Sequence, residues 1–289
     1  MMRHFSFLAI LAAAALTGCD TSRPADSIRV GSYNIRLSRG DVGTPNAWDE
    51  RKADLVDFIK ALSLDAFGLQ EVCPDQAEYL RENLPEFEFV GDHRGADRKS
   101  DEASPVFYRK GRFEAEKRGT FWLSETPDVP ASMSWGTSHT RVCSYLVLRD
   151  LTTGKRFCFA NTHTDHKSAE ARERGMMLVI ERMKEFGAGA PIVFTGDHNC
   201  SYDDPPAQAV RRVLKDARDV SAVADPGPAN TFHYWGDPQC MGRARDRIDY
   251  IYVSDGTRVL DFETHGDKRP GTDLYPSDHF PVTATIVLP

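Results

Sequence analysis

The sequence has no surplus of positive charge and no Lys/Arg-rich run. It carries 36 Lys and Arg against 43 Asp and Glu, a formal net charge of −7. Proteins that hold nucleic acid by bulk electrostatics present a basic surface. This charge balance therefore argues against a nucleic-acid partner held mainly by charge, without excluding one.

The sequence also lacks an apolar run long enough to cross a bilayer as a stable helix. The run 5–16 is too short, follows Arg3 and ends in Leu-Thr-Gly-Cys, which resembles a bacterial lipobox with Cys19 as the lipidated residue. We therefore expect a lipoprotein signal peptide at 1–18, a polar tether at 19–27 and one domain at 28–289. Such a protein is exported and lipid-anchored to the cell envelope, in the periplasm or at the outer membrane or cell surface. An ordinary secretory signal cleaved nearby is the alternative.

No Cys-x-x-Cys spacing is present, which argues against a structural zinc site. Beyond Cys19 the cysteines are Cys73, Cys143, Cys158, Cys200 and Cys240. An exported domain can form disulfides, but an odd number leaves at least one cysteine free or paired elsewhere. Cys143 and Cys158 flank an expected hairpin at 150–155.

Repeats, linkers and low-complexity segments are absent after residue 27, and about 270 residues can form one large core. Apolar periodicity predicts more strands than helices, with the helices between strands. The predicted strands are 28–35, 65–72, 105–108, 145–148, 156–162, 192–194, 248–253 and 280–288, and the predicted helices are 53–64, 170–186 and 206–217. The fold class is α/β, with two sheets packed face to face and helices outside.

Short polar blocks stand at or just beyond the ends of these strands. Glu71 follows an apolar strand, where a carboxylate is well placed to bind a hard cation such as Mg²⁺ or Mn²⁺. Asn34 also ends a strand, and its carboxamide can hold a metal-bound water or a phosphate oxygen. Each residue alone also fits a simpler interpretation, a solvent-facing Glu and a turn Asn that bonds its own backbone.

Acid–base chemistry is available in the later blocks. Asp197 can orient or deprotonate a water molecule, and Asn199 can donate to a phosphate oxygen. His163 can donate to a phosphoryl oxygen as well. Asp249 can hold the imidazole of His279 in orientation. Asx-turns and surface pairs explain any one block, but six concurrent strand-end blocks are harder to explain as independent turns.

The string 161–166 nearly matches the His-x-His-x-Asp-His string of two-metal hydrolases. Its first position is Asn161 rather than His, which argues against a dinuclear zinc centre. A zinc hydrolase built on His163, Asp165 and His166 is nevertheless an alternative.

Taken in order, three blocks resemble the endonuclease/exonuclease/phosphatase superfamily over residues 28–288. They are Gln70-Glu71, Gly196-Asp197-x-Asn199 and Ser277-Asp278-His279. The stretch 119–127 also looks like a bacterial branch of that family. The resemblance implies a four-layer sandwich of two mixed, mainly antiparallel sheets, with the site at one end.

The resemblance further implies a role for each block. Mg²⁺ or Mn²⁺ would bind mainly through Glu71, assisted by Asn34 and Asp278. Asp197 would orient or deprotonate water for in-line attack on phosphorus. The remaining catalytic residues would stabilise the phosphoryl charge: Asn199, His163 and His279, with Asp249 supporting His279. Position 198 departs from the family, which usually has a bulky apolar residue there; we expect His198 to be packed in the core with its hydrogen bonds satisfied.

We therefore expect an exported, monomeric, metal-dependent phosphoesterase acting on a phosphate ester, either a diester or a monoester. The charge balance favours a small molecule, sugar phosphate or lipid headgroup at least as much as nucleic acid. A rival interpretation is a non-catalytic surface lipoprotein that keeps the fold as a binding module. Four aromatic residues in loop-like stretches, some of which we expect to pack, are candidates for lining a pocket: Trp122, Trp135, Tyr234 and Trp235.

Overall fold

A computed structural model describes residues 23–289 of the chain. The expected signal peptide and the expected lipidation at Cys19 lie outside the described residues, and both stay predictions. Within residues 23–289, no helix combines the length and the apolar character that a membrane span requires.

Twelve strands form two six-stranded sheets. The first sheet has the order β11 (Arg258–Thr264), β12 (Val282–Val287), β1 (Ile28–Asn34), β2 (Ala66–Gln70), β4 (Val106–Arg109) and β3 (Phe87–Val90). The second has the order β5 (Phe113–Trp122), β6 (Val142–Asp150), β7 (Arg156–His163), β8 (Ile192–Asp197), β10 (Asp249–Val253) and β9 (Lys215–Asp216). The pairs β1–β2 and β7–β8 are parallel and the other pairs are antiparallel. The expected mixed, mainly antiparallel sheets are confirmed.

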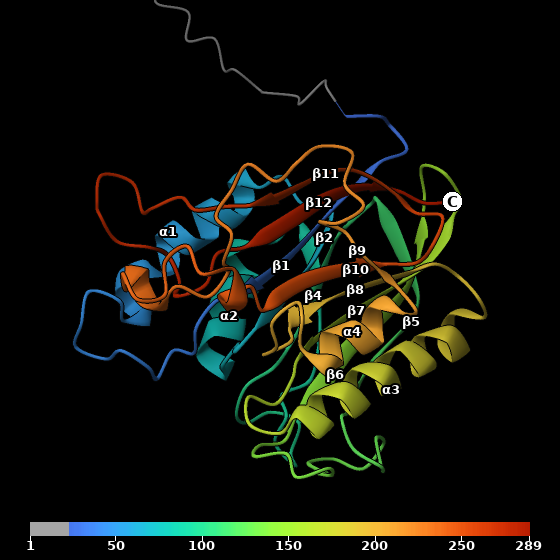
Figure 1. Ribbon diagram of the computed structural model, residues 1–289, viewed down its shortest axis with the longest axis horizontal. Coiled ribbons are helices and arrows are strands. Elements are labelled where there is room, and N and C mark those ends of the chain that lie inside the picture. The colour runs from blue at the N-terminus through green and yellow to red at the C-terminus, as the bar shows by residue number, and fades with distance from the viewer. Residues whose placement is uncertain (1–22) are drawn as a thin grey trace, which may run out of the picture.

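Helices cover the outer face of each sheet, as Figure 1 shows. Helices α1 (Trp48–Ala61) and α2 (Pro74–Asn83) lie on the first sheet, and α3 (Ala169–Gly187) and α4 (Pro205–Arg211) lie on the second. Strand side chains alternate between the two faces: in β2, Ala66 faces the core between the sheets while Phe67 and Leu69 face the helices. Three apolar clusters therefore separate four layers, which confirms the predicted sandwich.

Local pattern placed some elements wrongly. The predicted helix 206–217 ends at Arg211. The segment Lys215–Asp216 is instead a short strand that pairs with β10. The pairing is supported by Arg247, whose Nη2 donates to both carboxylate oxygens of Asp216 (2.7 Å each). Trp122 is not in a loop but ends β5, fully buried. The pattern missed β5 because its middle is exposed and charged. It also missed α2, β3, β9 and β11.

The cysteines form no disulfide within residues 23–289, and four of the five are buried. The expected hairpin between Cys143 and Cys158 is confirmed, since β6 ends at Asp150 and β7 begins at Arg156. The two cysteines do not lie opposite each other in this hairpin. Cys143 lies opposite Thr162 on the neighbouring strand, so the two thiols are not cross-strand partners.

His198 is packed in the core, as expected, but its ring nitrogens are not satisfied. The imidazole is fully buried and stacks on two tyrosine rings, with centroid distances of 5.5 Å to Tyr252 and 5.7 Å to Tyr250. The centroid of the Phe194 ring lies 4.8 Å away. Neither ring nitrogen makes a hydrogen bond of normal geometry with the described residues, although the Thr195 backbone is close enough to oppose slightly the fall in the pKa of the ring. Burial lowers the pKa of His198 to about 3, so the ring is neutral at neutral pH.

We predict that His198→Leu stabilises the protein. A buried polar group without a hydrogen-bond partner lowers the free energy of unfolding by about 1–3 kcal/mol. The apolar leucine side chain carries no such cost. The folded-state pKa lies below the ordinary value, so wild-type stability falls as pH drops below that value and the unfolded chain takes up a proton. The gain in free energy of unfolding should therefore be about 2 kcal/mol larger at pH 5 than at pH 7. Urea unfolding at both pH values measures this. His139→Gln, which changes an exposed imidazole, is the control, and a His198→Leu variant less stable than wild type contradicts the prediction.

Candidate functional site

The strand ends that carry the polar blocks meet at one edge of the sandwich. In the parallel pairs, Asn34 lies opposite Gln70 and His163 lies opposite Asp197. The antiparallel strand β10 begins with Asp249, also opposite Asp197. The carboxyl ends of parallel strands share one edge, so the topology brings these side chains together.

Asp197 is the centre of this group. Its Oδ2 accepts a hydrogen bond from Asn34 Nδ2 across the two sheets (2.9 Å), and lies 3.5 Å from His163 Nε2 and 3.8 Å from His279 Nε2. Its Oδ1 accepts from the backbone N–H of Asn199 (2.9 Å). One carboxylate thus faces residues from four of the predicted blocks.

His279 is held as a cation between two carboxylates. Its Nδ1 donates to Asp249 Oδ2 at 2.8 Å. Burial alone would lower the pKa of His279, but attraction and hydrogen bonding to Asp249 outweigh burial and raise it to about 10. Burial and repulsion from Asp249 raise the pKa of Asp197 to about 7.

His163 is a neutral donor. The Asn199 side-chain amide donates to the Thr164 carbonyl (3.0 Å) and to His163 Nε2 (2.9 Å), so this ring nitrogen accepts. The ring proton is then on Nδ1, which is buried and has no hydrogen-bond partner among the described residues. Burial, reinforced by the cation of Arg141, holds the pKa of His163 well below its ordinary value.

The carboxylates of Glu71 and Asp278, which also line the pocket, suit a hard cation. Glu71 has a left-handed backbone (φ 63°), a strained conformation typical of functional sites. Burial and repulsion from Glu71 raise the pKa of Asp278, and a divalent cation between them would relieve that repulsion. Asn34 offers nitrogen rather than oxygen here: its Nδ2 donates to Glu71 Oε1 (3.1 Å), while its Oδ1 accepts from the Arg36 backbone. The Asn34 amide therefore bridges Glu71 and Asp197.

These groups open into a pocket of about 490 Å³, within the range of small-molecule sites. Six of the eight predicted residues line it, and Asn34 and Asp249 lie buried behind them. His166, named from the sequence only for the zinc alternative, lines the pocket too. Sequence reasoning missed the other lining residues, which come from loops: Arg36, Leu37, Arg94, Glu102, His139, Arg141, Phe232 and Ile248.

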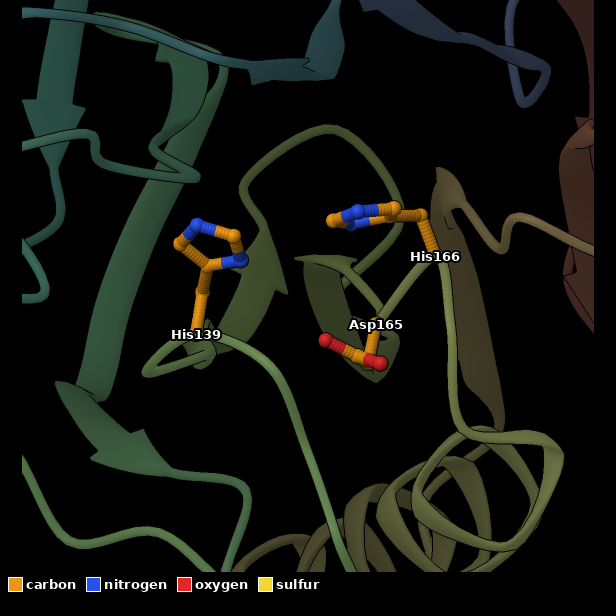
Figure 2. A group of neighbouring side chains, drawn as sticks. All are labelled: His139, Asp165 and His166. Carbon is orange, nitrogen blue, oxygen red and sulfur yellow. The ribbon is translucent and has the colours of Figure 1, made fainter.

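The predicted zinc set is not assembled as a unit. Asp165 and His166 gather with His139 instead of His163 (Figure 2). The Asp165 carboxylate accepts from the backbone and hydroxyl of Ser138 and from two backbone N–H groups at the start of α3. It acts as a loop anchor, which argues against the zinc alternative.

The predicted pocket aromatics do not line this pocket. Trp122 is in the core, and Trp135 lies beside a separate surface groove. Tyr234 and Trp235 form a short turn with left-handed backbone. Phe232, which the pattern did not single out, is the aromatic residue that lines the pocket, 5.1 Å from the His279 ring.

The chain belongs to the Endonuclease/Exonuclease/phosphatase family, whose sequence profile matches residues 31–279. Members of this family are hydrolases that act on phosphoric esters, and they typically use divalent metal ions.

Solved structures from bacteria are similar over most of the chain. An endonuclease/exonuclease/phosphatase from Bacteroides vulgatus has a TM-score of 0.85 and 32% identity, over 91% of this chain and 99% of that one. A mannosyl-6-phosphatase of Bacteroides thetaiotaomicron has a TM-score of 0.82 and 33% identity, over 90% of this chain and all of that one.

Curated relatives are more distant and longer. Rat nocturnin is 22% identical over 91% of this chain, but the match spans 66% of nocturnin. An uncharacterised mimivirus protein is matched over 32% of its length. At 19% identity and a TM-score of 0.70, the human nocturnin catalytic domain shares the fold.

We predict that Asp249 controls the charge of His279. In metal-free wild type, His279 should stay protonated from pH 6 to 9, because its pKa is about 10. Asp249→Asn removes the ion pair that opposes burial, so the pKa of His279 should fall by more than one unit. NMR titration of the imidazole nitrogens measures this. Asp57→Asn, on the exposed face of α1, is the matched control, and an unchanged His279 titration in Asp249→Asn contradicts the assignment.

Proposed function

We propose that this protein hydrolyses a phosphoric ester with the help of Mg²⁺ or Mn²⁺ held by Glu71 and Asp278. The observation that carries the proposal is the convergence of Asp197, His163 and His279 on one pocket, which the carboxylates of Glu71 and Asp278 also line. Phosphoryl transfer depends mainly on positioning and charge stabilisation. This arrangement offers a base, two charge-stabilising donors and a cation site.

Each residue has a distinct task in this proposal. Asp197 orients the attacking water and takes its proton as the new bond to phosphorus forms. The protonated His279 and the Nδ1–H of His163 stabilise the charge that develops on the phosphoryl oxygens. Asn199 fixes the ring of His163, and Asp249 fixes that of His279. Glu71 and Asp278 would hold the metal ion, which would supply a positive charge for the phosphoryl group and for the leaving oxygen. The bond from phosphorus to the ester oxygen breaks as the new bond forms, and the departing alkoxide takes a proton from solvent water.

The substrate we propose is a small phosphomonoester of the sugar-phosphate class. Similarity to a mannosyl-6-phosphatase at 33% identity supports it, as does a pocket of about 490 Å³. The net charge of −7 makes nucleic acid the less favoured substrate.

A hydrolysis panel tests the reaction. It contains mannose 6-phosphate, p-nitrophenyl phosphate, bis-p-nitrophenyl phosphate and plasmid DNA, each with Mg²⁺, Mn²⁺, Zn²⁺ or EDTA. We expect turnover with Mg²⁺ or Mn²⁺ and none with EDTA. Asp197→Asn should lower kcat by about 10²–10⁴-fold, the range of a lost general base. Glu71→Gln should raise the metal concentration needed for half-maximal activity at least tenfold.

The control is Glu78→Gln, an exposed carboxylate on α2 that should change neither quantity. Turnover in EDTA, or turnover unchanged in Asp197→Asn, would refute the mechanism. Activity that requires tightly held zinc would support the zinc hydrolase. The absence of turnover with every substrate, together with ligand binding insensitive to Glu71→Ala, would support the binding module.

The pKa values also predict the pH profile. Asp197 must be deprotonated to act as a base, and its pKa is about 7 without metal; a neighbouring cation lowers it further. His279 must stay protonated, and its pKa is about 10. We therefore expect kcat/KM with saturating Mg²⁺ to rise up to about pH 7, stay level, and fall near pH 10. A profile that falls between pH 7 and 9 would contradict the role of His279.

A further inference from the structure

Arg141 is a buried cation in the pocket wall that forms no close ion pair with a carboxylate of the described residues; Glu102, Asp165 and Asp197 favour its charge only from a longer distance. It is 6% exposed, and its Nε and Nη1 make no hydrogen bond with any described residue. The other two pocket arginines differ, since Arg94 pairs with Glu102 (2.9 Å) and Arg36 with Asp41 (3.0 Å). A buried charge is costly unless it is paired, so an anion is the partner that the Arg141 site lacks.

Two histidines at the pocket mouth extend this site. Arg141 Nη2 donates to His166 Nδ1 at 3.3 Å, which leaves the His166 proton on Nε2. Ser138 Oγ donates to Asp165 (2.6 Å) and therefore accepts from His139 Nδ1 (3.0 Å). In Figure 2 the two imidazoles point toward each other above Asp165; their centroids are 5.5 Å apart.

The hydrogen bonds decide between a metal and an anion at this cluster. Each oxygen of Asp165 already accepts two hydrogen bonds. The Nδ1 lone pair of His166 faces Arg141, whose cation lowers the pKa of His166 together with burial. One free lone pair, on His139, does not make a metal site, and the adjacent guanidinium repels a cation. An anion is attracted instead.

The location of Arg141 indicates which anion. Arg141 and His163 line the same small recess together with Glu102, and all three residues also line the pocket that contains Asp197. Arg141 and His163 both present buried donors without partners: Nε–H and Nη1–H of Arg141 and Nδ1–H of His163. A phosphomonoester dianion has three unesterified oxygens, whereas a diester has two and one negative charge less. These additional donors can therefore hydrogen-bond to the third unesterified oxygen of a monoester, which a diester lacks.

We propose that Arg141, supported by His166, binds the third unesterified oxygen of a phosphomonoester and so makes the site selective for monoesters over diesters. This inference rests on the proposed phosphoesterase function. It assigns to Arg141 the choice between substrates, while water activation stays with Asp197.

The test compares two esters with the same leaving group, p-nitrophenyl phosphate and methyl p-nitrophenyl phosphate, at pH 8 with saturating Mg²⁺. We expect Arg141→Gln to lower kcat/KM for the monoester at least tenfold, about 1.4 kcal/mol, and to change the diester value by less than about threefold. Arg141→Lys should retain part of the selectivity, and His166→Gln should lose a smaller part. Arg174→Gln, an exposed substitution on α3, is the matched control.

A binding measurement separates the inference from the proposed function. Inorganic phosphate and dimethyl phosphate are titrated calorimetrically into wild type and Arg141→Gln in the presence of Mg²⁺. The inference requires that wild type prefer phosphate and that the variant lose this preference, whether or not either ester is hydrolysed. If wild type hydrolyses neither these esters nor any substrate of the hydrolysis panel, the proposed function fails, and the phosphate preference still judges the role of Arg141.

Three results would overturn the inference. Equal losses for both esters in Arg141→Gln would make it a general positioning residue. A loss confined to a substrate with a second phosphate, such as mannose 1,6-bisphosphate, would place a different anionic group at the subsite. Stoichiometric Mn²⁺ or Zn²⁺ that is lost in His139→Gln, measured by metal analysis, would make the cluster a cation site.

Discussion

The structure depends on a buried asparagine between the two sheets. Asn161, on β7, is fully buried and makes four hydrogen bonds. Its amide nitrogen donates to the carbonyls of Leu69 (2.7 Å) and Pro105 (3.0 Å) in and beside the first sheet, and its oxygen accepts from Gln70 (2.7 Å) and Thr195 (3.1 Å). Apolar packing alone lets two sheets slide, whereas a network of directional buried hydrogen bonds specifies one arrangement. Asn161 therefore fixes how the two sheets face each other, and this explains why the position is not a metal ligand.

This constraint reaches the site through sequence neighbours. Gln70 directly precedes Glu71, so the hydrogen bond that Gln70 donates to Asn161 fixes Glu71 relative to the strands that carry His163 and Asp197. Gly68 makes room for Asn161, because a Cβ there would lie 2.1 Å from Asn161 Cγ. A second constraint is Arg51, whose buried guanidinium donates to the carbonyls of Ile35, Arg36 and Pro276. It ties the loop after β1 to the loop that carries Asp278 and His279.

The sequence predicted the layers and most of the site, because both leave local signals. Apolar alternation marks a buried strand, and a polar residue at its edge marks a strand end. Glu71 and Asp197, at the ends of strands, and His279, just before the last strand, were named in this way, and all three line the same pocket. Arg141 and His139 leave no such signal. They come from an irregular segment, and only the tertiary fold brings them beside His163. The sequence also could not predict that the ring nitrogens of His198 lack hydrogen-bond partners, since the hydrogen bonds of a buried ring depend on neighbours from other strands. Charged strand β5 was missed because periodicity identifies only strands with a buried face.

The pocket contains three groups of charged side chains, and their net charges differ in sign. One imidazolium, His279, lies between Asp197 and Asp249, so this side of the site carries one net negative charge when both carboxylates are ionised. Glu71 and Asp278 repel each other, and Arg36, with its Nη1 3.8 Å from Asp278 Oδ2, offsets this repulsion only in part, so a bound cation would relieve it further. Arg141 is unbalanced in the opposite sense. A metal ion on one side and a phosphate dianion reaching the other neutralise both excesses at once. The cation and the substrate should therefore favour each other's binding, because each removes charge that the fold leaves uncompensated.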